Sequence, residues 1–275
     1  MSSNIICKRD IRMVILSDEH CGHLSGLTPP EYQGKFITEN VAKHNKLTQI
    51  EKELWNFFET RIHQLQKEKK IDVLVNNGDF LDGDGFRSGG TEQLTTDRNH
   101  QVSMCKKIVE LVNANTNIIV AGTAYHTGEN EDWEEVLANE IDCKFESHAH
   151  LDINTVRFDI KHHVGSASVP HTRYTPIARE ALWSKLWAGQ ELTPKSPHYL
   201  IRSHVHYFTY TDDGNMIAMT TPALQAFGSK YGSRRCSGIP TVGFVSFDIN
   251  QHGFVNMRKH MAYLPAQVAR ATTIR

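Results

Sequence analysis

Short runs of β-branched and other apolar residues alternate with longer helical patterns in the first half of the chain. The short runs are almost continuously apolar, which is typical of strands buried on both faces of a sheet. In the longer stretches apolar residues recur about every 3.6 positions, which predicts amphipathic helices. This alternation predicts an α/β layered fold with a parallel sheet. The strands are expected at 11–16, 71–75 and 117–121, and the helices at 46–69, 96–113 and 131–139.

The second half is richer in strands. The segment 155–162 alternates apolar and polar residues, 199–202 is a short apolar run, and 175–186 has a helical pattern. Two hairpins are expected, the first around the turn sequence DDGN and the second around NQHG. Because no Pro-, Ser- or Gly-rich linker divides the halves, we expect residues 1–275 to form one domain with two packed sheets. The hairpin strands are expected at 208–211 with 216–220, and at 241–249 with 254–260.

Composition places the chain among folded proteins. It has 275 residues, of which 39% are hydrophobic and 22% charged, a balance that argues against disorder. No apolar stretch approaches the length of a membrane span, and the N-terminus lacks the apolar region of a signal peptide. The expected location is therefore the cytoplasm, with no membrane partner. The sequence leaves the oligomeric state open, so a homo-oligomer is not excluded.

Charge is divided unevenly along the chain. The net charge is −1, yet residues 1–150 carry 16 Lys and Arg against 24 Asp and Glu, whereas residues 151–275 carry 14 against 7. Overall attraction to nucleic acid or membrane is not implied, but a basic surface in the second half is compatible with a polyanionic substrate.

Histidine is abundant, with 16 residues against 5 cysteines. The cysteines are odd in number and far apart, and no C-x-x-C pair exists. A thiolate zinc finger and a disulfide framework are therefore both disfavoured. Histidine is the side chain most often recruited to metals and to proton transfer, so the excess points to imidazole chemistry.

Asp and His residues follow the ends of five expected strands. In α/β sheets, ligands bind outside the carboxyl ends of the strands, and carboxylate together with imidazole suits a divalent transition metal. Within D-x-H and H-x-H the paired residues are two apart, so on an extended segment both would project to one face. The strand-end sequences are Asp18-Glu19-His20, Gly78-Asp79-Phe80-Leu81-Asp82-Gly83, Gly122-Thr123-Ala124-Tyr125-His126, His162-His163 and Ser203-His204-Val205-His206.

This ordered series resembles the calcineurin-like metallophosphoesterases, whose pattern is D-x-H, G-D-x-x-D-G, G-N-H-[DE], a lone His and G-H-x-H. The second block matches in full, and the resemblance spans about residues 11–210. It implies a fold of two mixed β-sheets packed as a sandwich flanked by helices. It also implies a binuclear hydrolase of phosphate esters.

The resemblance implies two divalent ions as cofactors, with manganese favoured and iron or zinc as alternatives. Asp18, His20 and His206 would hold the first ion, and Asp79 would bridge both. His204 and one of His162 or His163 would hold the second ion. Asn77 and Asp82 are interpreted as residues that orient the ligands or shape the turn.

The third block departs from the family pattern. Thr123 stands where the family has Asn, and the His comes two residues late, at His126. His126 is either the catalytic proton donor on a longer loop or a replacement ligand for the missing Asn. Both roles remain open at this stage.

The expected substrate is a phosphodiester of nucleic acid or nucleotide type, which would make the protein a phosphodiesterase or nuclease. This rests on the basic second half and on a flexible basic loop that would bind substrate through Tyr231, Arg234 and Arg235. Alternatives are a phosphomonoesterase acting on a small metabolite or phosphoprotein, and a catalytically idle binding scaffold. His148 and His150 are expected in a solvent-exposed loop, and the acidic run 129–135 in an exposed helix turn.

Overall fold

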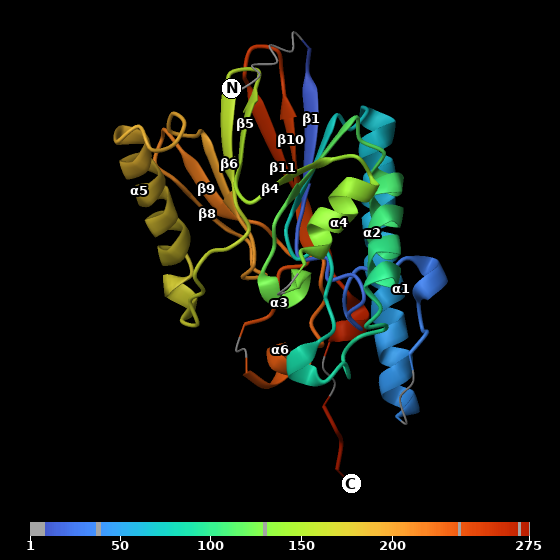
Figure 1. The fold of residues 1–275 in the computed structure, drawn as a ribbon. Helices are drawn as coiled ribbons and strands as arrows, with labels where there is room; N and C mark the ends of the chain where they lie inside the picture. The colour runs from blue at the N-terminus through green and yellow to red at the C-terminus, as the bar shows by residue number, and fades with distance from the viewer. Residues whose placement is uncertain (1–8, 37–39, 129–130, 236–237, 269–270, 275) are drawn as a thin grey trace.

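The computed structural model describes residues 9–36, 40–128, 131–235, 238–268 and 271–274, which fold into two mixed β-sheets with helices outside (Figure 1). The first sheet has the order β11-β10-β1-β2-β3-β4. Its strands β1 to β4 run parallel, and β10 and β11 extend it in antiparallel pairing. The strands are β1 (Ile11–Leu16), β2 (Val73–Asn77), β3 (Thr116–Val120), β4 (Lys144–Glu146), β10 (Gly243–Ile249) and β11 (Val255–Met261).

The second sheet has the order β5-β6-β7-β9-β8. Strands β6, β7 and β9 run parallel, and the edge strands β5 and β8 pair with them in antiparallel fashion. The strands are β5 (Ala149–Ile153), β6 (Val156–Ile160), β7 (Tyr199–Arg202), β8 (Thr209–Asp212) and β9 (Ile217–Thr220).

Helices cover the outer faces of both sheets, α1, α2 and α4 on the first sheet and α5 on the second (Figure 1). No helix in the described ranges is long and apolar enough to cross a membrane. The helices are α1 (Val41–Glu68), α2 (Arg98–Val112), α3 (Ala124–Thr127), α4 (Trp133–Glu140), α5 (Thr175–Gly189) and α6 (Lys230–Arg235). Short 3₁₀ turns lie at Pro30–Tyr32, Phe86–Ser88, Pro170–Thr172 and Pro265–Gln267.

Strand β1 shows how the apolar pattern builds three layers. All six of its residues are buried, and alternate side chains point to opposite faces. Met13 and Ile15 join the core between the two sheets, whereas Val14 and Leu16 join the core beneath the helices. Burial of both faces explains why this strand is apolar at every position except Arg12.

The predicted fold class is confirmed, since two mixed sheets pack together with flanking helices. Strands β1 and β7 have the predicted bounds, and both hairpins form. Strand β2 lies two residues later than predicted and includes Asn76 and Asn77. Helix α1 begins earlier than predicted because Asn40 caps it, accepting a hydrogen bond from the Lys43 backbone N–H.

Two local predictions of secondary structure are wrong, and one short helix was missed. The basic segment at 230–235 is the short helix α6 rather than a loop. His150 lies on strand β5, which pairs with β6, and not in a loop. Helix α3, which carries His126, was not predicted at all because four residues are too few to show a helical period.

Candidate metal centre

Five strand ends from both sheets converge at one end of the sandwich. Asp18 follows β1, Asp79 follows β2, and Thr123 follows β3. From the second sheet, His162 follows β6 and His204 follows β7. Backbone hydrogen bonds join the first two segments, with the Asp18 N–H donating to the Gly78 carbonyl at 3.0 Å. The topology therefore gathers residues that lie far apart in the sequence.

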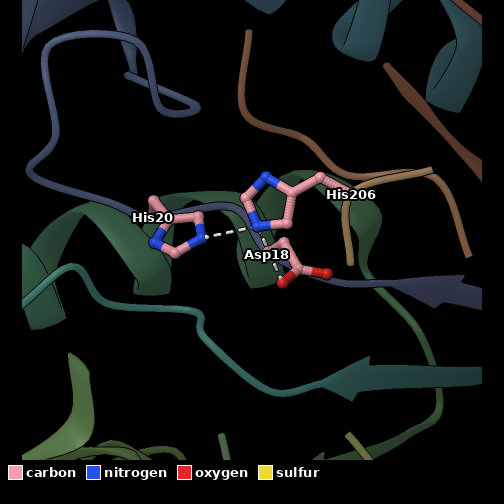
Figure 2. Close-up of side chains that lie close together, drawn as sticks. All are labelled: Asp18, His20 and His206. Atoms are coloured by element: carbon pink, nitrogen blue, oxygen red, sulfur yellow. Dashed lines mark hydrogen bonds and ion pairs between the residues drawn. The ribbon is translucent and has the colours of Figure 1, made fainter. Parts of the chain in front are cut away.

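The first cluster consists of Asp18, His20 and His206 (Figure 2). The Nε2 atoms of His20 and His206 lie 3.2 Å apart, and His206 Nε2 lies 3.2 Å from Asp18 Oδ1. Asp18 and His20 are almost fully buried. The three side chains present their ligand atoms to one another, as Figure 2 shows.

The second cluster consists of Asp79, His162 and His204. His162 Nε2 lies 3.1 Å from Asp79 Oδ2, and His204 Nδ1 lies 4.0 Å from the same oxygen. His162 Nδ1 lies 2.6 Å from the Asn77 carbonyl, to which it donates. This bond leaves the Nε2 atom of His162 directed at the Asp79 carboxylate.

Asp79 connects the two clusters through His126. His20, Asp79 and His126 form a third group whose ligand atoms lie within 4.8 Å of one another. His126 Nε2 lies 4.0 Å from Asp79 Oδ2, and its ring lies 4.5 Å from that of His20, centroid to centroid. One carboxylate thus faces imidazoles of both clusters, which is the arrangement needed to bridge two ions.

The backbone of these residues is left-handed. Asp18, His20, Asp79, His204 and His206 all have φ between 47° and 70°, a conformation that is uncommon in residues other than glycine. Such conformations persist where the surrounding structure enforces them, and they gather at functional sites. The expectation of an extended D-x-H and H-x-H is wrong: the paired side chains are brought together by tight turns.

The positions of the ligand atoms suit a bound cation better than they suit hydrogen bonds between the ligand residues. Asp18 Oδ1 and His162 Nε2 are buried and form no hydrogen bond, although both lie within ion-pair distance of a neighbour. A buried polar atom without a hydrogen bond is costly. Because His20 Nδ1 faces Asp82 at 2.9 Å, its Nε2 is left as a lone pair facing His206. A metal ion would satisfy all of these atoms.

Electrostatics also favours a cation here. Burial alone would raise the pKa of Asp18, but the adjacent His206 outweighs burial and lowers it to about 2. Burial would likewise lower the pKa of His162, yet the charge of Asp79 raises it to about 10. For His20 burial prevails, reinforced by the charge of His126, and the pKa falls to about 4. The carboxylates are thus held ionised, and positive charge is drawn toward them.

Asp82 and Asn77 orient the histidine rings of the clusters by hydrogen bonds, as predicted. Asp82 Oδ1 faces the Nδ1 atoms of both His20 and His126, at 2.9 and 3.3 Å. Its other oxygen accepts a bond of 2.6 Å from Gln93 Nε2. Asn77 accepts from His162 and donates to Ser203 Oγ at 2.6 Å. Such partners fix the ring orientation of ligating histidines.

Thr123 has a role that the sequence prediction did not assign. Its backbone N–H and its hydroxyl donate to Asp79 Oδ1 at 2.6 and 3.0 Å. Thr123, which follows Gly122 in the third motif, therefore orients Asp79. The sequence signal for this role was the position of Thr123 directly after Gly122 in the third motif.

Glu134 was also missed, and the prediction of an exposed acidic turn is wrong at this residue. Its side chain is fully buried, and its two oxygens accept from the backbone N–H groups of Phe80 and Gly122, each at 2.7 Å. Burial and the charge of Asp79 raise its pKa to about 8. Glu134 shares a helix face with the buried Leu137 and Ala138, and this spacing was a signal that it points inward.

Other predicted site residues lie outside these groups. His163 is exposed and packs its ring 4.8 Å from that of His204, so His162 is the one that enters the cluster. Arg234 is exposed on α6. The side chains of Tyr231 and Arg235 lie outside the described residues.

Comparison with solved structures finds proteins of similar fold. Vacuolar protein sorting 29 of Cryptosporidium parvum is 11% identical, with a TM-score of 0.47 over 91% of this chain and 98% of that one. Vps29 of Entamoeba histolytica complexed with Zn²⁺ is 14% identical, with a TM-score of 0.46 over 91% and 99%. A novel archaeal phosphodiesterase is 14% identical, with a TM-score of 0.42 over 90% and 99%. No family model matches the chain, and no curated protein matches it by sequence.

Likenesses at such low identity concern the fold and not the activity. The chain itself combines two mixed sheets, flanking helices and Asp/His clusters at the strand ends. This is the sandwich of two mixed sheets with flanking helices that the motif resemblance implied. The protein is therefore an α/β sandwich whose strand ends carry residues that could bind metal.

Proposed function

We propose that the protein is a binuclear metallophosphoesterase that hydrolyses phosphodiester bonds in nucleic acid or nucleotides. The observation that carries this proposal is the position of Asp79, whose Oδ2 faces His162, His204 and His126 within 4.0 Å. Asp18, His20 and His206 would hold the first ion, and His162 and His204 the second, with Asp79 between them. A binding scaffold without activity has no need of this buried, strained ligand set.

The bound ions would supply a hydroxide at neutral pH and stabilise charge on the phosphoryl oxygens. The side chains of the protein would supply the orientation of the ligands and the proton for the leaving oxygen. Thr123 and Asp82 hold Asp79, His20 and His126 in orientation. Although burial opposes it, the hydrogen bond that the His126 ring donates to Asp82 raises the pKa of His126 to about 9, so in the metal-free protein its ring carries a proton at neutral pH. His126 is therefore suited to give its Nε2 proton to the leaving oxygen.

The rim of the site supports a nucleotide-type substrate. The Arg87 guanidinium lies 4.8 Å above the ring of Tyr125, whose ring lies 4.7 Å from that of His126. Phe86, next to Arg87, is 81% exposed. Aromatic rings and arginine side chains are groups on which bases stack. Their position next to His126 would place a base on the leaving-group side.

Substrate choice is tested by comparing three substrates with Mn²⁺ present: bis-p-nitrophenyl phosphate, p-nitrophenyl phosphate and single-stranded DNA. We expect the diester and DNA to be preferred, because the rim offers the stacking surfaces of Phe86, Arg87 and Tyr125. Phe86→Ala should raise KM for DNA by about tenfold, the value of one stacked base at ~1–3 kcal/mol, and leave the small diester unchanged. Preference for the monoester would overturn the substrate assignment.

His126→Ala separates the two roles left open by the sequence. We expect this variant to keep its bound metal and lose about 10²–10⁴-fold in kcat, the usual contribution of proton transfer. The reason is that His20 and His206 supply imidazoles for the first ion and His162 and His204 for the second, which leaves His126 available for proton transfer. The measurement is metal content by mass spectrometry together with diester hydrolysis. Loss of one ion per chain would instead assign His126 as a ligand.

A further inference from the structure

A second set of nitrogen and oxygen donors lies outside the strand-end clusters. Asp159 on β6 sits between Phe158 and Ile160, which face the core between the sheets, so its side chain points to the opposite face of the second sheet. There it contacts Ser184 of α5. His150 of β5 is the direct cross-strand partner of Asp159. His148 precedes His150 by two residues and lies on the same side.

We propose that His148, His150 and Asp159 form a third metal site, suited to Zn²⁺ or a similar divalent transition ion. Their ligand atoms all lie within 4.8 Å of one another. His148 Nε2 lies 2.7 Å from Asp159 Oδ1, and the two imidazole rings lie 4.3 Å apart, centroid to centroid. Two imidazoles and one carboxylate form a common zinc donor set, with a fourth position left for water.

Asp159 is held in place for this role. It is 4% exposed, and Arg202 Nη1 donates to its Oδ1 at 2.8 Å while Ser184 Oγ donates to its Oδ2 at 3.3 Å. Glu180 in turn accepts from Arg202 Nε at 3.2 Å. The carboxylates of Asp159 and Glu180 and the guanidinium of Arg202 together carry a net negative charge, which attracts a dication. Partners that orient a ligating carboxylate in this way strengthen metal binding.

His150 distinguishes a metal site from a simple ion pair. A pair between His148 and Asp159 needs no third residue, whereas a metal needs the His150 lone pair. His150 is exposed and therefore accessible to an ion from solvent.

The test is Co²⁺ titration of the full chain, followed by the visible absorption of tetrahedral cobalt. It is performed in the Asp79→Asn background with and without His150→Ala. Any cobalt bound by the remaining strand-end ligands contributes equally to the spectra of the two proteins. This contribution therefore cancels when one spectrum is subtracted from the other. We expect His150→Ala to weaken one cobalt site by more than about tenfold, since loss of a mere supporting partner costs ~10–100-fold. His252→Ala, which removes an exposed histidine at the β10–β11 turn, is the matched control.

Equal cobalt binding with and without His150 would overturn the third site. So would the absence of a tetrahedral cobalt signal that depends on His148 or His150. Because His150 is exposed, its substitution leaves the core intact, and thermal unfolding of each variant checks this. Hydrolysis is not measured here, so failure of the third site and failure of the phosphodiesterase proposal are distinguishable.

Discussion

Asp79→Asn is expected to abolish Mn²⁺-dependent hydrolysis of bis-p-nitrophenyl phosphate, with a loss of at least about 10³-fold. Asp79 Oδ2 is the single oxygen that faces His162, His204 and His126. Replacing one oxygen by an amide removes the charge that would bridge two ions. Loss of one stabilising donor in an active site already costs ~10²–10³-fold, and loss of the bridge removes more. The measurement is kcat/KM with metal content on the same samples.

The shape of the side chain is kept in Asp79→Asn, so folding should be preserved. Thr123 can still donate to the remaining carbonyl oxygen through its backbone N–H. Asp152→Asn, which neutralises an exposed carboxylate on β5, is the matched control and should retain full activity. Undiminished hydrolysis by a folded Asp79→Asn protein would refute the assignment of Asp79 as the bridge.

Gly122→Ala is expected to lower activity by about 10²-fold or more through a steric effect on Asp79. A Cβ at position 122 would lie 2.3 Å from the Asp79 backbone nitrogen and 2.4 Å from its Oδ1. Neither contact is tolerable, and both belong to the residue that joins the clusters. The loop must therefore shift, and a misplacement of ~1 Å in an active site can cost ~10²-fold. Metal content and diester hydrolysis are the measurements.

Gly189→Ala provides the control for this substitution. A Cβ at position 189, at the end of α5, meets nothing within 4 Å, so the same chemical change should leave activity and metal content unchanged. Thermal unfolding of both variants separates a local displacement of Asp79 from loss of the fold. If Gly122→Ala matches Gly189→Ala in activity, the close packing of Gly122 on Asp79 does not position the bridge.

The layered fold could be predicted because the buried apolar positions recur at regular intervals along the sequence. Strand β1 is apolar from Met13 to Leu16 because Met13 and Val14 enter cores on opposite faces. Elements with few buried residues left no such pattern. Strand β4 spans only Lys144–Glu146 and has no fully buried residue, and α3 is a single turn. Their positions are fixed by tertiary contacts, which no local pattern records.

The candidate ligands could be predicted because each follows a strand end in a recognisable order. The residues that hold them could not. Glu134 lies 55 residues beyond Asp79 in the sequence, and its acidic neighbourhood suggested solvent, whereas the fold buries it against two backbone N–H groups. The choice between His162 and His163 depended on which of the two side chains turns inward, and the structure buries His162. The left-handed turns at the ligands are likewise set by tertiary packing.

The most direct test of the central claim is an anomalous difference map from crystals of the Mn²⁺-loaded protein. The account predicts two peaks at the strand ends, about 3.5–4 Å apart as in other two-metal sites. One should be bounded by Asp18, His20 and His206, and the other by His162 and His204, with Asp79 in contact with both. A single peak, or none at these residues, would contradict the binuclear centre.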